Sequence, residues 1–344
     1  MEQELEAHLR GQQARHFHFP RTILLYDLTN THFEGEARGN AKAKRGKNKQ
    51  GRSDCPQVVV GMVYDEQGFE LAHRTFAGNQ SDSTSLVTMV ESLRQAAGYP
   101  ESAELLPAAK VLVIVDAGVA TAANLKLLAK AHFHYLVNDS RRGRKKWQAE
   151  FAQEEQFQVL PGRENQTEVK VRAVDLKGQG LLLLCKRQVR RDKELAIRSG
   201  AETRFVAGLE KLHARLQKGQ LTDGAKAQRA LGKIMARATR VQRFYQVELK
   251  DPVHLRAGLA WQRKDEVRAQ DEQLLGCYVL RTDRSELSDQ QLWELYVLLS
   301  RAEDGFAALK GDLGLRPNYH QLEGRVDAHI FLTVLAYQLL RFIT

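Results

Sequence analysis

The sequence predicts an α/β protein: a mixed sheet flanked by helices, with an inserted subdomain that is mostly β and partly helical. Short apolar runs alternate with helical patterns through the first 138 residues, which is typical of strand–helix crossovers. The next stretch is basic and varied, and after Asp289 a helical period returns and persists. We therefore expect a core formed by residues 1–138 and 286–344, and an insertion formed by residues 139–285.

The composition points to a protein with a real core and a polyanionic partner. The chain has 344 residues, 43% of them hydrophobic, and a formal net charge of +10. Such an excess of Lys and Arg suggests nucleic acid, because each neutralised phosphate releases counterions. The three cysteines are far apart, which argues against a disulfide framework or a zinc site. The polar N-terminus does not read as a signal peptide, and the apolar stretch Ile330–Thr344 is too short to span a membrane. We expect a cytoplasmic protein with a buried C-terminal helix.

Three strands are expected near the N-terminus. The apolar run at residues 22–26 (TILLY) ends at Asp27 and predicts a buried strand. Two β-rich runs, Gln57–Tyr64 and Phe69–Phe76, are separated by Asp-Glu-Gln-Gly, which predicts a hairpin. Before the hairpin, Glu34–Asp54 is rich in Gly, Lys, Arg and Asn, and we expect it to be a mobile loop.

Helices then alternate with two more strands. Helices are expected from Asp82 to about Ala97 and from about Thr121 to Ala131. The run Lys110–Val115 (KVLVIV) is the clearest buried strand, and it ends at Asp116; His132–Asn138 is a further strand candidate. Three strands followed by strand–helix crossovers resemble the order of the ribonuclease-H-like fold.

The expected insertion has three kinds of segment. It opens with a basic turn at residues 139–146 and continues with strand-like runs over residues 150–190 and 244–285. Between them, residues 192–240 are predicted to be helical and are strongly basic. This stretch is either an arm over DNA or a soluble helix pair.

Three carboxylates form the candidate site. Asp27 and Asp116 each close a predicted strand, which gives a metal ligand a rigid support, although an aspartate there can also simply cap a turn. Tyr296, Glu303 and Lys310 are spaced seven apart, beside an apolar helical stripe. The pattern alone also fits solvated helix residues. The stripe consists of Leu292, Leu295, Leu299, Ala302, Phe306, Leu309 and Leu313.

Converging carboxylates suit hard divalent cations, which take oxygen ligands. Two such ions can activate a nucleophile on one side of a phosphate and stabilise the leaving oxygen on the other. A nucleotide-binding α/β enzyme is disfavoured, because no glycine-rich phosphate loop follows a strand.

Five segments in order resemble bacterial insertion-sequence DDE transposases, in the branch with a Tyr-Arg-Glu-Lys signature. They are YDLTNTHFEG, GRSDCPQVVVGMVYDEQGF, FAGNQSD, VIVDAGVATAANL and the final run that begins SRAEDGFAALKGDLG. The resemblance spans most of the chain and is weakest in residues 140–270. It implies a ribonuclease-H-like catalytic domain with a mostly β insertion between the second Asp and the Glu.

The resemblance also implies roles for single residues. Asp27 and Asp116 match the two metal-binding aspartates and Glu303 matches the catalytic glutamate, holding Mg²⁺ with Mn²⁺ as a substitute. Tyr296 and Lys310 match the flanking residues that contact the DNA backbone near the cut end. The implied partners are double-stranded DNA, both the terminal inverted repeats of an element and a target, bound by a homodimer on paired ends. A membrane partner is not expected.

Two departures from the family pattern stand out. Leu299 occupies the position of the signature Arg, and only 26 residues precede Asp27, whereas relatives use a longer region there to bind element ends. The chemistry is expected to be intact while end recognition is in question. Two alternatives stay open: a non-catalytic DNA-binding relic, and a nuclease on the same fold.

The densest basic run lies in the predicted loop after Asp27. It is either a solvated loop or, as we favour, a clamp on phosphates, which contributes affinity without sequence readout. Its cations are Lys42, Lys44, Arg45, Lys47, Lys49 and Arg52.

Overall fold

The computed structural model confirms a mixed α/β architecture. It describes residues 4–5, 8, 11–12, 23–47, 51–52, 54–97, 111–139, 143–161, 168–176, 180–251 and 253–343. Residues 1–20 lie largely outside these ranges, as does Lys49. The chain divides into two compact units. Unit 1 comprises Met1–Ser140, Ala173–Leu183 and Val279–Thr344, and unit 2 comprises Arg141–Arg172 and Leu184–Tyr278.

Within the described residues, nine strands form one mixed sheet in the order β3-β2-β1-β4-β5-β11-β8-β7-β6. β1 pairs antiparallel with β2 and parallel with β4, and β4 pairs parallel with β5. The bounds are β1 Ile23–His32, β2 Gln57–Asp65, β3 Glu70–Ala77, β4 Leu112–Val115, β5 His134–Asn138, β6 Gln158–Leu160, β7 Val169–Asp175, β8 Leu181–Arg187 and β11 Cys277–Thr282. The predicted hairpin of β2 and β3 is therefore confirmed.

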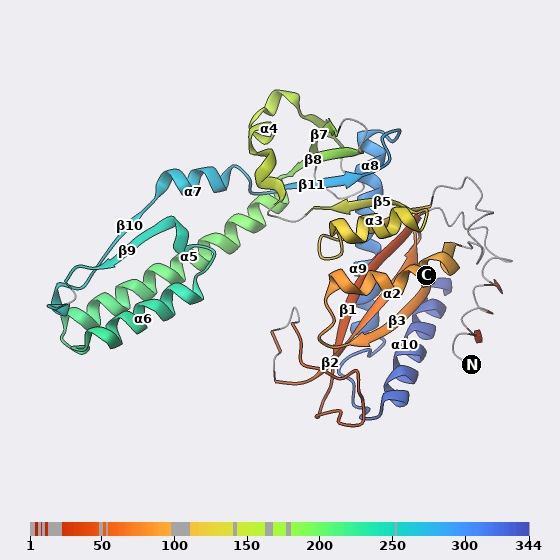
Figure 1. The fold of residues 1–344 in the computed structure, drawn as a ribbon, viewed down its shortest axis with the longest axis horizontal. Coiled ribbons are helices and arrows are strands. Elements are labelled where there is room, and N and C mark those ends of the chain that lie inside the picture. Colours follow the sequence, from red (N-terminus) through yellow and green to blue (C-terminus); the bar gives the residue numbers. More distant parts are fainter. Residues whose placement is uncertain are drawn as a thin grey trace. The chain divides into compact units, whose positions relative to one another are not determined.

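Helices cover both faces of the unit 1 sheet (Figure 1). The helices α2 (Asp82–Ala97) and α3 (Ala122–Lys130) pack on one face, close to their predicted bounds. The helices α9 (Leu299–Lys310) and α10 (Glu323–Ile343) lie on the other, where the ring of Tyr64 meets Phe306 and Tyr337 edge to face. A shorter helix, α8 (Asp289–Val297), precedes α9.

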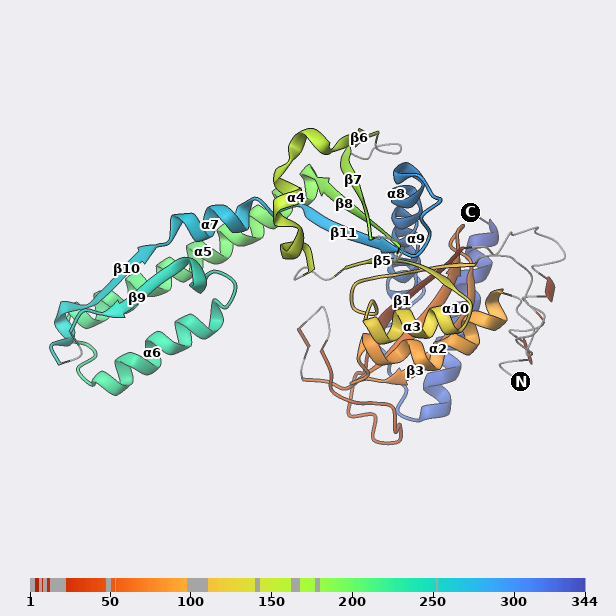
Figure 2. The same cartoon turned by 45° about the horizontal axis from the view of Figure 1, so that its top comes forward.

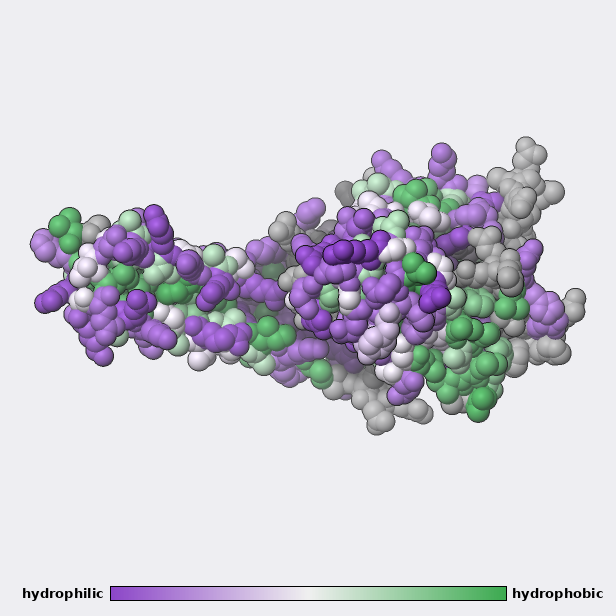
Figure 3. All heavy atoms as spheres, turned by 90° about the horizontal axis from the view of Figure 1, so that it is seen from below, coloured by the Kyte–Doolittle hydropathy of each residue, from purple (hydrophilic) through white to green (hydrophobic). Residues whose placement is uncertain are grey.

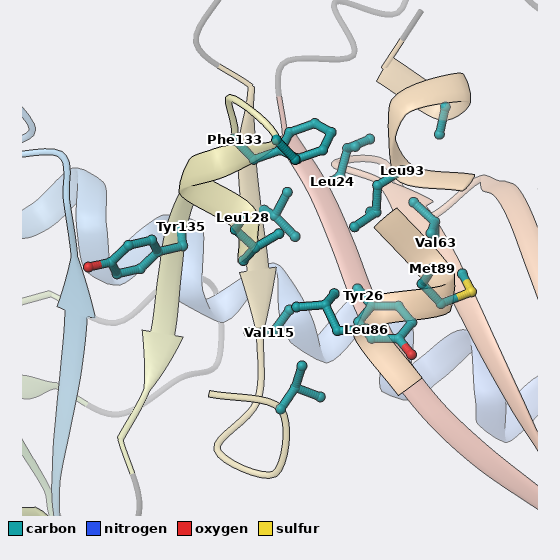
Figure 4. Close-up of a cluster of buried hydrophobic side chains, with 14 of the residues drawn as sticks. Leu24, Tyr26, Val63, Leu86, Met89, Leu93, Val115, Leu128, Phe133 and Tyr135 are labelled. Atoms are coloured by element: carbon teal, nitrogen blue, oxygen red, sulfur yellow. The ribbon is translucent and has the colours of Figure 1, made fainter. Parts of the chain in front are cut away.

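The core of unit 1 lies between the sheet and α2 with α3 (Figure 4). Because successive strand residues point to opposite faces, the even-numbered residues of β1 and the odd-numbered residues of β4 share this face. Tyr26 and Val115 belong to the cluster, together with Leu86, Met89 and Leu128 from the helices. The residues between them on each strand therefore point to the face that carries α9 and α10.

The first strand is longer than expected. We predicted that it ends at Asp27, but β1 continues to His32, because its pairing with β2 persists through His32↔Gln57 after its pairing with β4 ends at Tyr26↔Val115. Asp27 is therefore the first residue of β1 after its pairing with β4 ends.

The segment Glu34–Asp54 is not a free loop over its described part. Its Glu34 N–H donates to the carbonyl of Asn318, Gly39 bridges to Leu322, and Lys44 bridges to Gln57. Asn40 is buried. Contacts distant in sequence therefore tie these residues to the rest of unit 1, and the mobility of the segment stays a prediction.

The predicted continuous helix around Glu303 is broken in two. At Leu298 the backbone bonds tighten to i→i−3 geometry, from Leu298 N to Leu295 O and from Arg301 N to Leu298 O. The Ser300 hydroxyl also donates to the carbonyl of Val297, at 2.7 Å. Tyr296 consequently lies on α8, while Glu303 and Lys310 lie on α9.

Unit 2 has its own core, which lies between helices and a hairpin (Figure 2). The predicted basic helices are confirmed as α5 and α6. The apolar residues of α5, including Phe205, Leu209 and Leu212, meet Tyr245 and Leu259 from the strands. The bounds are α4 Gln148–Ala152, α5 Gln188–Gln217, α6 Gly224–Arg237, α7 Asp265–Glu272, β9 Tyr245–Leu249 and β10 Leu259–Arg263, with short 3-10 turns at Gly143–Trp147, Glu154–Gln156, Gln242–Phe244 and Leu255–Ala257. The helix α7 was not predicted within the strand-like stretch.

The C-terminal helix is longer and less buried than expected. α10 has 21 residues and is long and apolar enough to cross a membrane by length and composition alone, which is weak evidence. One face packs through Val326, Ile330 and Val334, whereas Leu332 and Leu339 are exposed. The prediction of a buried helix therefore holds for one face only.

Candidate active site

Strand register brings the two predicted aspartates together. In the parallel pair β1–β4, Tyr26 is opposite Val115, so Asp27 and Asp116 occupy the next position on each chain. Neighbouring strands are about 4.8 Å apart, and both residues have the parity that points to the face carrying α9. The backbone N–H of Leu28 donates to the Asp27 carboxylate at 2.7 Å, and Asp116 is exposed.

An asparagine extends this row onto a third strand. Val115 is opposite Val137 in the parallel pair β4–β5, so Asn138 follows Asp116 across the sheet. Asn138 is 7% exposed, and its amide Nδ2 donates to the phenolic oxygen of Tyr296 at 2.9 Å. Its Oδ1 is buried without a hydrogen-bond partner among the described residues. Tyr296, which sequence spacing had placed beside Glu303 on one helix, is thus brought to the aspartate row from α8.

The third predicted carboxylate, Glu303, belongs to α9, which contacts β1. Glu303 is exposed on α9, three residues before Phe306, whose ring packs on Tyr64. In the part of the chain that the structure describes, no three His, Cys, Asp or Glu side chains are grouped so as to hold a metal ion. The register sets Asp27 beside Asp116, and the grouping of Glu303 with them stays a prediction.

A cavity of about 710 Å³ opens in unit 1 beyond the end of β4. Its lining includes Leu28 from β1, Gly118 from the turn after Asp116, Asp82 from α2, and the cations Lys47 and Lys310. The Lys310 ammonium also lies 5.2 Å from the centre of the Phe306 ring. Lys310 therefore contributes positive charge to a cavity that Leu28, next to Asp27 in the chain, and Gly118, two residues after Asp116, also line.

Asp82, the first residue of α2, lies close to the turn that follows Asp116. A Cβ on Gly118 would stand 2.6 Å from Asp82 Oδ2, so only glycine lets the turn after Asp116 approach that carboxylate so closely. The Tyr26 hydroxyl donates to Ser85 at 2.8 Å. Burial raises the pKa of Tyr26, and the charges of Asp27 and Asp82 raise it further. Both carboxylates therefore act on the same buried phenol.

Two aspartates thus lie at adjacent strand ends of the sheet. The family described as Transposase DDE domain matches residues 18–339. The chain belongs to this family. Comparison with curated proteins gives no match. The match covers both units of the transposase DDE domain, so the basic helices α5 and α6 fall inside it.

The basic run of this transposase domain is partly engaged within the protein. The Lys42 ammonium lies 2.8 Å from Asp327 and 3.4 Å from Glu323 on α10. Burial lowers the pKa of Lys42, but the hydrogen bond and charge of Asp327 outweigh it, so the pKa is raised overall. These two carboxylates engage Lys42 within unit 1, and its contact with a phosphate stays a prediction.

The other cations predicted to contact phosphates differ in whether an acidic side chain of the protein already lies close to them. Arg52 makes a two-pronged contact with Asp54, with its Nη2 at 2.8 Å, and Arg45 lies 3.6 Å from Glu36. Lys44 and Lys47 are exposed, and only Lys47 of these two lines the cavity beside the aspartates.

Sequence reasoning missed Asn138 and the proximity of Asp82. Asn138 ends an apolar strand just as Asp116 does, so the same strand-end signal could have identified it. Nothing in the spacing of Asp82 indicates its approach to Gly118, because that contact depends on how α2 packs on the sheet.

Proposed function

We propose that this chain is a catalytically active DNA transposase of the Tyr-Arg-Glu-Lys branch, which cuts at the ends of an insertion element and joins the freed 3′-OH to target DNA. The observation that carries the proposal is the β1–β4 register, because it sets two carboxylates side by side at one sheet edge in a chain of the transposase DDE family. Unit 2 lies within residues 139–285, and we propose that it is the expected insertion.

The donor chemistry of the aspartate pair fits a hard divalent cation. Asp27 and Asp116 supply anionic oxygen at adjacent positions on rigid strands. The residues that would hold Mg²⁺, or Mn²⁺ in its place, are Asp27, Asp116 and Glu303. When bound, the ions supply a polarised nucleophile and stabilise the leaving oxygen of the phosphodiester.

Side chains around the aspartates would bind the phosphates of the DNA. Lys310 and Lys47 line the neighbouring cavity, where they can bind backbone phosphates as point charges. Asn138 orients the Tyr296 phenol through its amide, so that the hydroxyl can donate to a phosphate oxygen. The expected substrate is duplex DNA, with element ends and target bound by a homodimer.

The deciding experiment is nicking of supercoiled plasmid in Mn²⁺ by the wild-type chain and by Asp116→Asn, Asp27→Asn and Glu303→Gln. Each variant keeps the size of the side chain and removes its charge. We expect nicking to fall about a thousandfold, equivalent to about 4 kcal/mol of lost transition-state stabilisation. The matched control is Asp304→Asn, because Asp304 is the exposed acidic neighbour of Glu303 on α9.

The outcomes separate the alternatives. Normal nicking by Glu303→Gln would remove Glu303 from the site while leaving the aspartates in it. No nicking by the wild type, with DNA binding retained, would favour a non-catalytic relic. A nuclease on the same fold would nick but would not join a labelled 3′-OH duplex to plasmid DNA. Light scattering of the DNA complex tests the dimer, and a one-chain complex would contradict it.

A further inference from the structure

A basic groove between α5 and α6 of unit 2 stands out among the charged surfaces of the described chain. We define the α5–α6 groove by the six cations that line it: Lys211, Arg215, Lys226, Arg229, Lys233 and Arg237. Its volume is about 570 Å³, and no Asp or Glu lines it. All six side chains belong to exposed residues.

Helix geometry aligns these cations into two facing rows. On α6, Lys226, Arg229, Lys233 and Arg237 are spaced three, four and four residues apart, so they share one helical face. On α5, Lys211 and Arg215 are one turn apart. The α6 row extends for about 16 Å at 1.5 Å per residue.

The two helices are fixed to one another by an apolar contact beneath the rows. Gly208 on α5 faces Ile234 on α6, and a Cβ at Gly208 would lie 3.4 Å from the Ile234 Cγ2 atom. Leu212 and Ala227 are buried in the same unit 2 core. The apolar face of α6 is therefore occupied within the protein, which argues against insertion of this helix into a lipid surface.

The cations of the groove are not used for internal ion pairs, with one exception. Lys226 lies 3.8 Å from Asp223, but within the described residues no carboxylate stands within ion-pair distance of the other five. Elsewhere in unit 2 the pattern is the opposite: Arg198, which is 7% exposed, lies 2.8 Å from Glu272 and 3.7 Å from Asp271. Five clustered cations repel one another unless an anionic partner neutralises them.

Figure 3 views the protein from below and shows hydrophilic side chains over this part of unit 2, with hydrophobic atoms between them. Residues 203–240 contain nine Lys and Arg against two acidic residues. A rigid pair of cationic rows of this length matches about five successive phosphates of one strand, spaced 3.4 Å along the duplex axis.

We propose that the α5–α6 groove is a DNA-binding site that holds the phosphate backbone of duplex DNA without reading its sequence. The site is carried by unit 2 alone and needs none of the metal-binding carboxylates. The inference rests on the proposed function for its choice of DNA as the polyanion.

The test is binding of a fluorescent 30-base-pair duplex of arbitrary sequence to the full chain in EDTA, followed by fluorescence anisotropy from 50 to 200 mM salt. The groove variant is K226Q/R229Q/K233Q. Because each lost phosphate contact flattens the plot of log affinity against log salt by about 0.9, we expect the slope to become nearly three units shallower and affinity at 100 mM to fall about tenfold or more.

The control variant K193Q/K250Q/K264Q removes the same charge from exposed positions of unit 2 outside the groove. We expect it to bind within twofold of the wild type. The charge-preserving variant K226R/R229K/K233R should restore binding, and circular dichroism of each variant checks that α6 is intact.

Several results would overturn the proposal: equal binding by the groove variant and the wild type, an equal loss in the control, or no binding by the wild type. Stronger competition by an RNA duplex than by the DNA duplex would identify RNA as the partner and would also overturn it. Since the assay contains no metal, failure of plasmid nicking leaves this result untouched, and loss of the groove leaves the aspartate chemistry to be tested separately.

Discussion

At the scale of single residues, Asn138 links the aspartate row to the helix that carries Tyr296. Its amide Nδ2 donates a hydrogen bond to the Tyr296 oxygen, while its buried Oδ1 has no hydrogen-bond partner among the described residues. A buried acceptor without a partner costs about 1–3 kcal/mol, and water, an ion or a ligand can remove that cost. The position of this atom beside Asp116 on the sheet is consistent with a role in binding a polar ligand there.

The carboxyl group of Asp65 gives unit 1 a specific pH dependence. Its Oδ1 accepts the N–H groups of Gln67 and Phe69 at 2.9 Å, but Oδ2 is buried without a hydrogen-bond partner among the described residues. Burial raises the pKa of Asp65, and the backbone hydrogen bonds oppose that rise without cancelling it. A raised folded-state pKa means that the folded protein binds the proton more tightly than the unfolded chain does.

The sign of the effect follows from that difference. The stabilisation is fully present below the unfolded pKa, near 3.9, and is lost as pH rises through the folded pKa. We therefore expect the thermal midpoint of wild type to fall across this window relative to that of Asp65→Asn, which keeps the Oδ1 acceptor. Midpoints measured from pH 4 to 8 test this, with Glu66→Gln as the neighbouring control. Parallel curves for wild type and Asp65→Asn would contradict it.

At the scale of helices and strands, the close approach of α9 to the sheet depends on a glycine. A Cβ at Gly305 would stand 2.9 Å from the Tyr337 hydroxyl and 3.2 Å from Tyr64. Both rings are buried, so neither can move aside freely. The same helix carries Glu303 and Lys310.

We expect Gly305→Ala to destabilise the protein by about 1–3 kcal/mol, through overpacking, and to reduce plasmid nicking by displacing α9. The control is Gly232→Ala on α6, where a Cβ meets nothing within 4 Å. That substitution should instead stabilise its helix by up to about 1 kcal/mol. Urea unfolding and the nicking assay measure both effects. Equal stabilisation by the two substitutions would show that α9 is not tightly packed there.

The elements were predictable where local pattern decides them. The apolar runs of β2, β3 and β4 and the capped helices α2 and α3 follow from periodicity and turn residues alone. The continuation of β1 past Asp27 was not, because it depends on β2 as a partner. The break at Leu298 was missed because the apolar stripe continues through it. The hydrogen bond from the Ser300 hydroxyl to the Val297 carbonyl, which accompanies the break, does not alter the hydrophobic periodicity of the sequence.

The candidate site was predictable in its residues more than in its assembly. Strand ends indicated Asp27 and Asp116, and register then sets them side by side, which no spacing in the sequence encodes. The seven-residue spacing of Tyr296 and Glu303 places both on one side only if they share a helix. In the structure they lie on different helices, and Tyr296 approaches Asn138 from α8. The grouping of Glu303 with the aspartates stays a prediction.

At the scale of the whole molecule, the described residues of each unit contain a hydrophobic core. One lies between the unit 1 sheet and the pair α2 and α3, and the other between α5, α6 and the β9–β10 hairpin. Each core contains a leucine with no exposed surface: Leu128 in unit 1 and Leu209 in unit 2. Because local stability follows local burial, each unit is expected to open with its own free energy.

A matched pair of cavity mutations tests that expectation. Leu128→Ala and Leu209→Ala should each cost about 2–5 kcal/mol, from lost burial and the cavity left behind. Amide hydrogen exchange should then accelerate around β1, β4, α2 and α3 for Leu128→Ala, and around α5, α6, β9 and β10 for Leu209→Ala. Uniform acceleration across the chain in both variants would mean that the two cores unfold as one cooperative unit. Localised acceleration would mean that the α5–α6 groove and the aspartate row depend on separate cores for their stability.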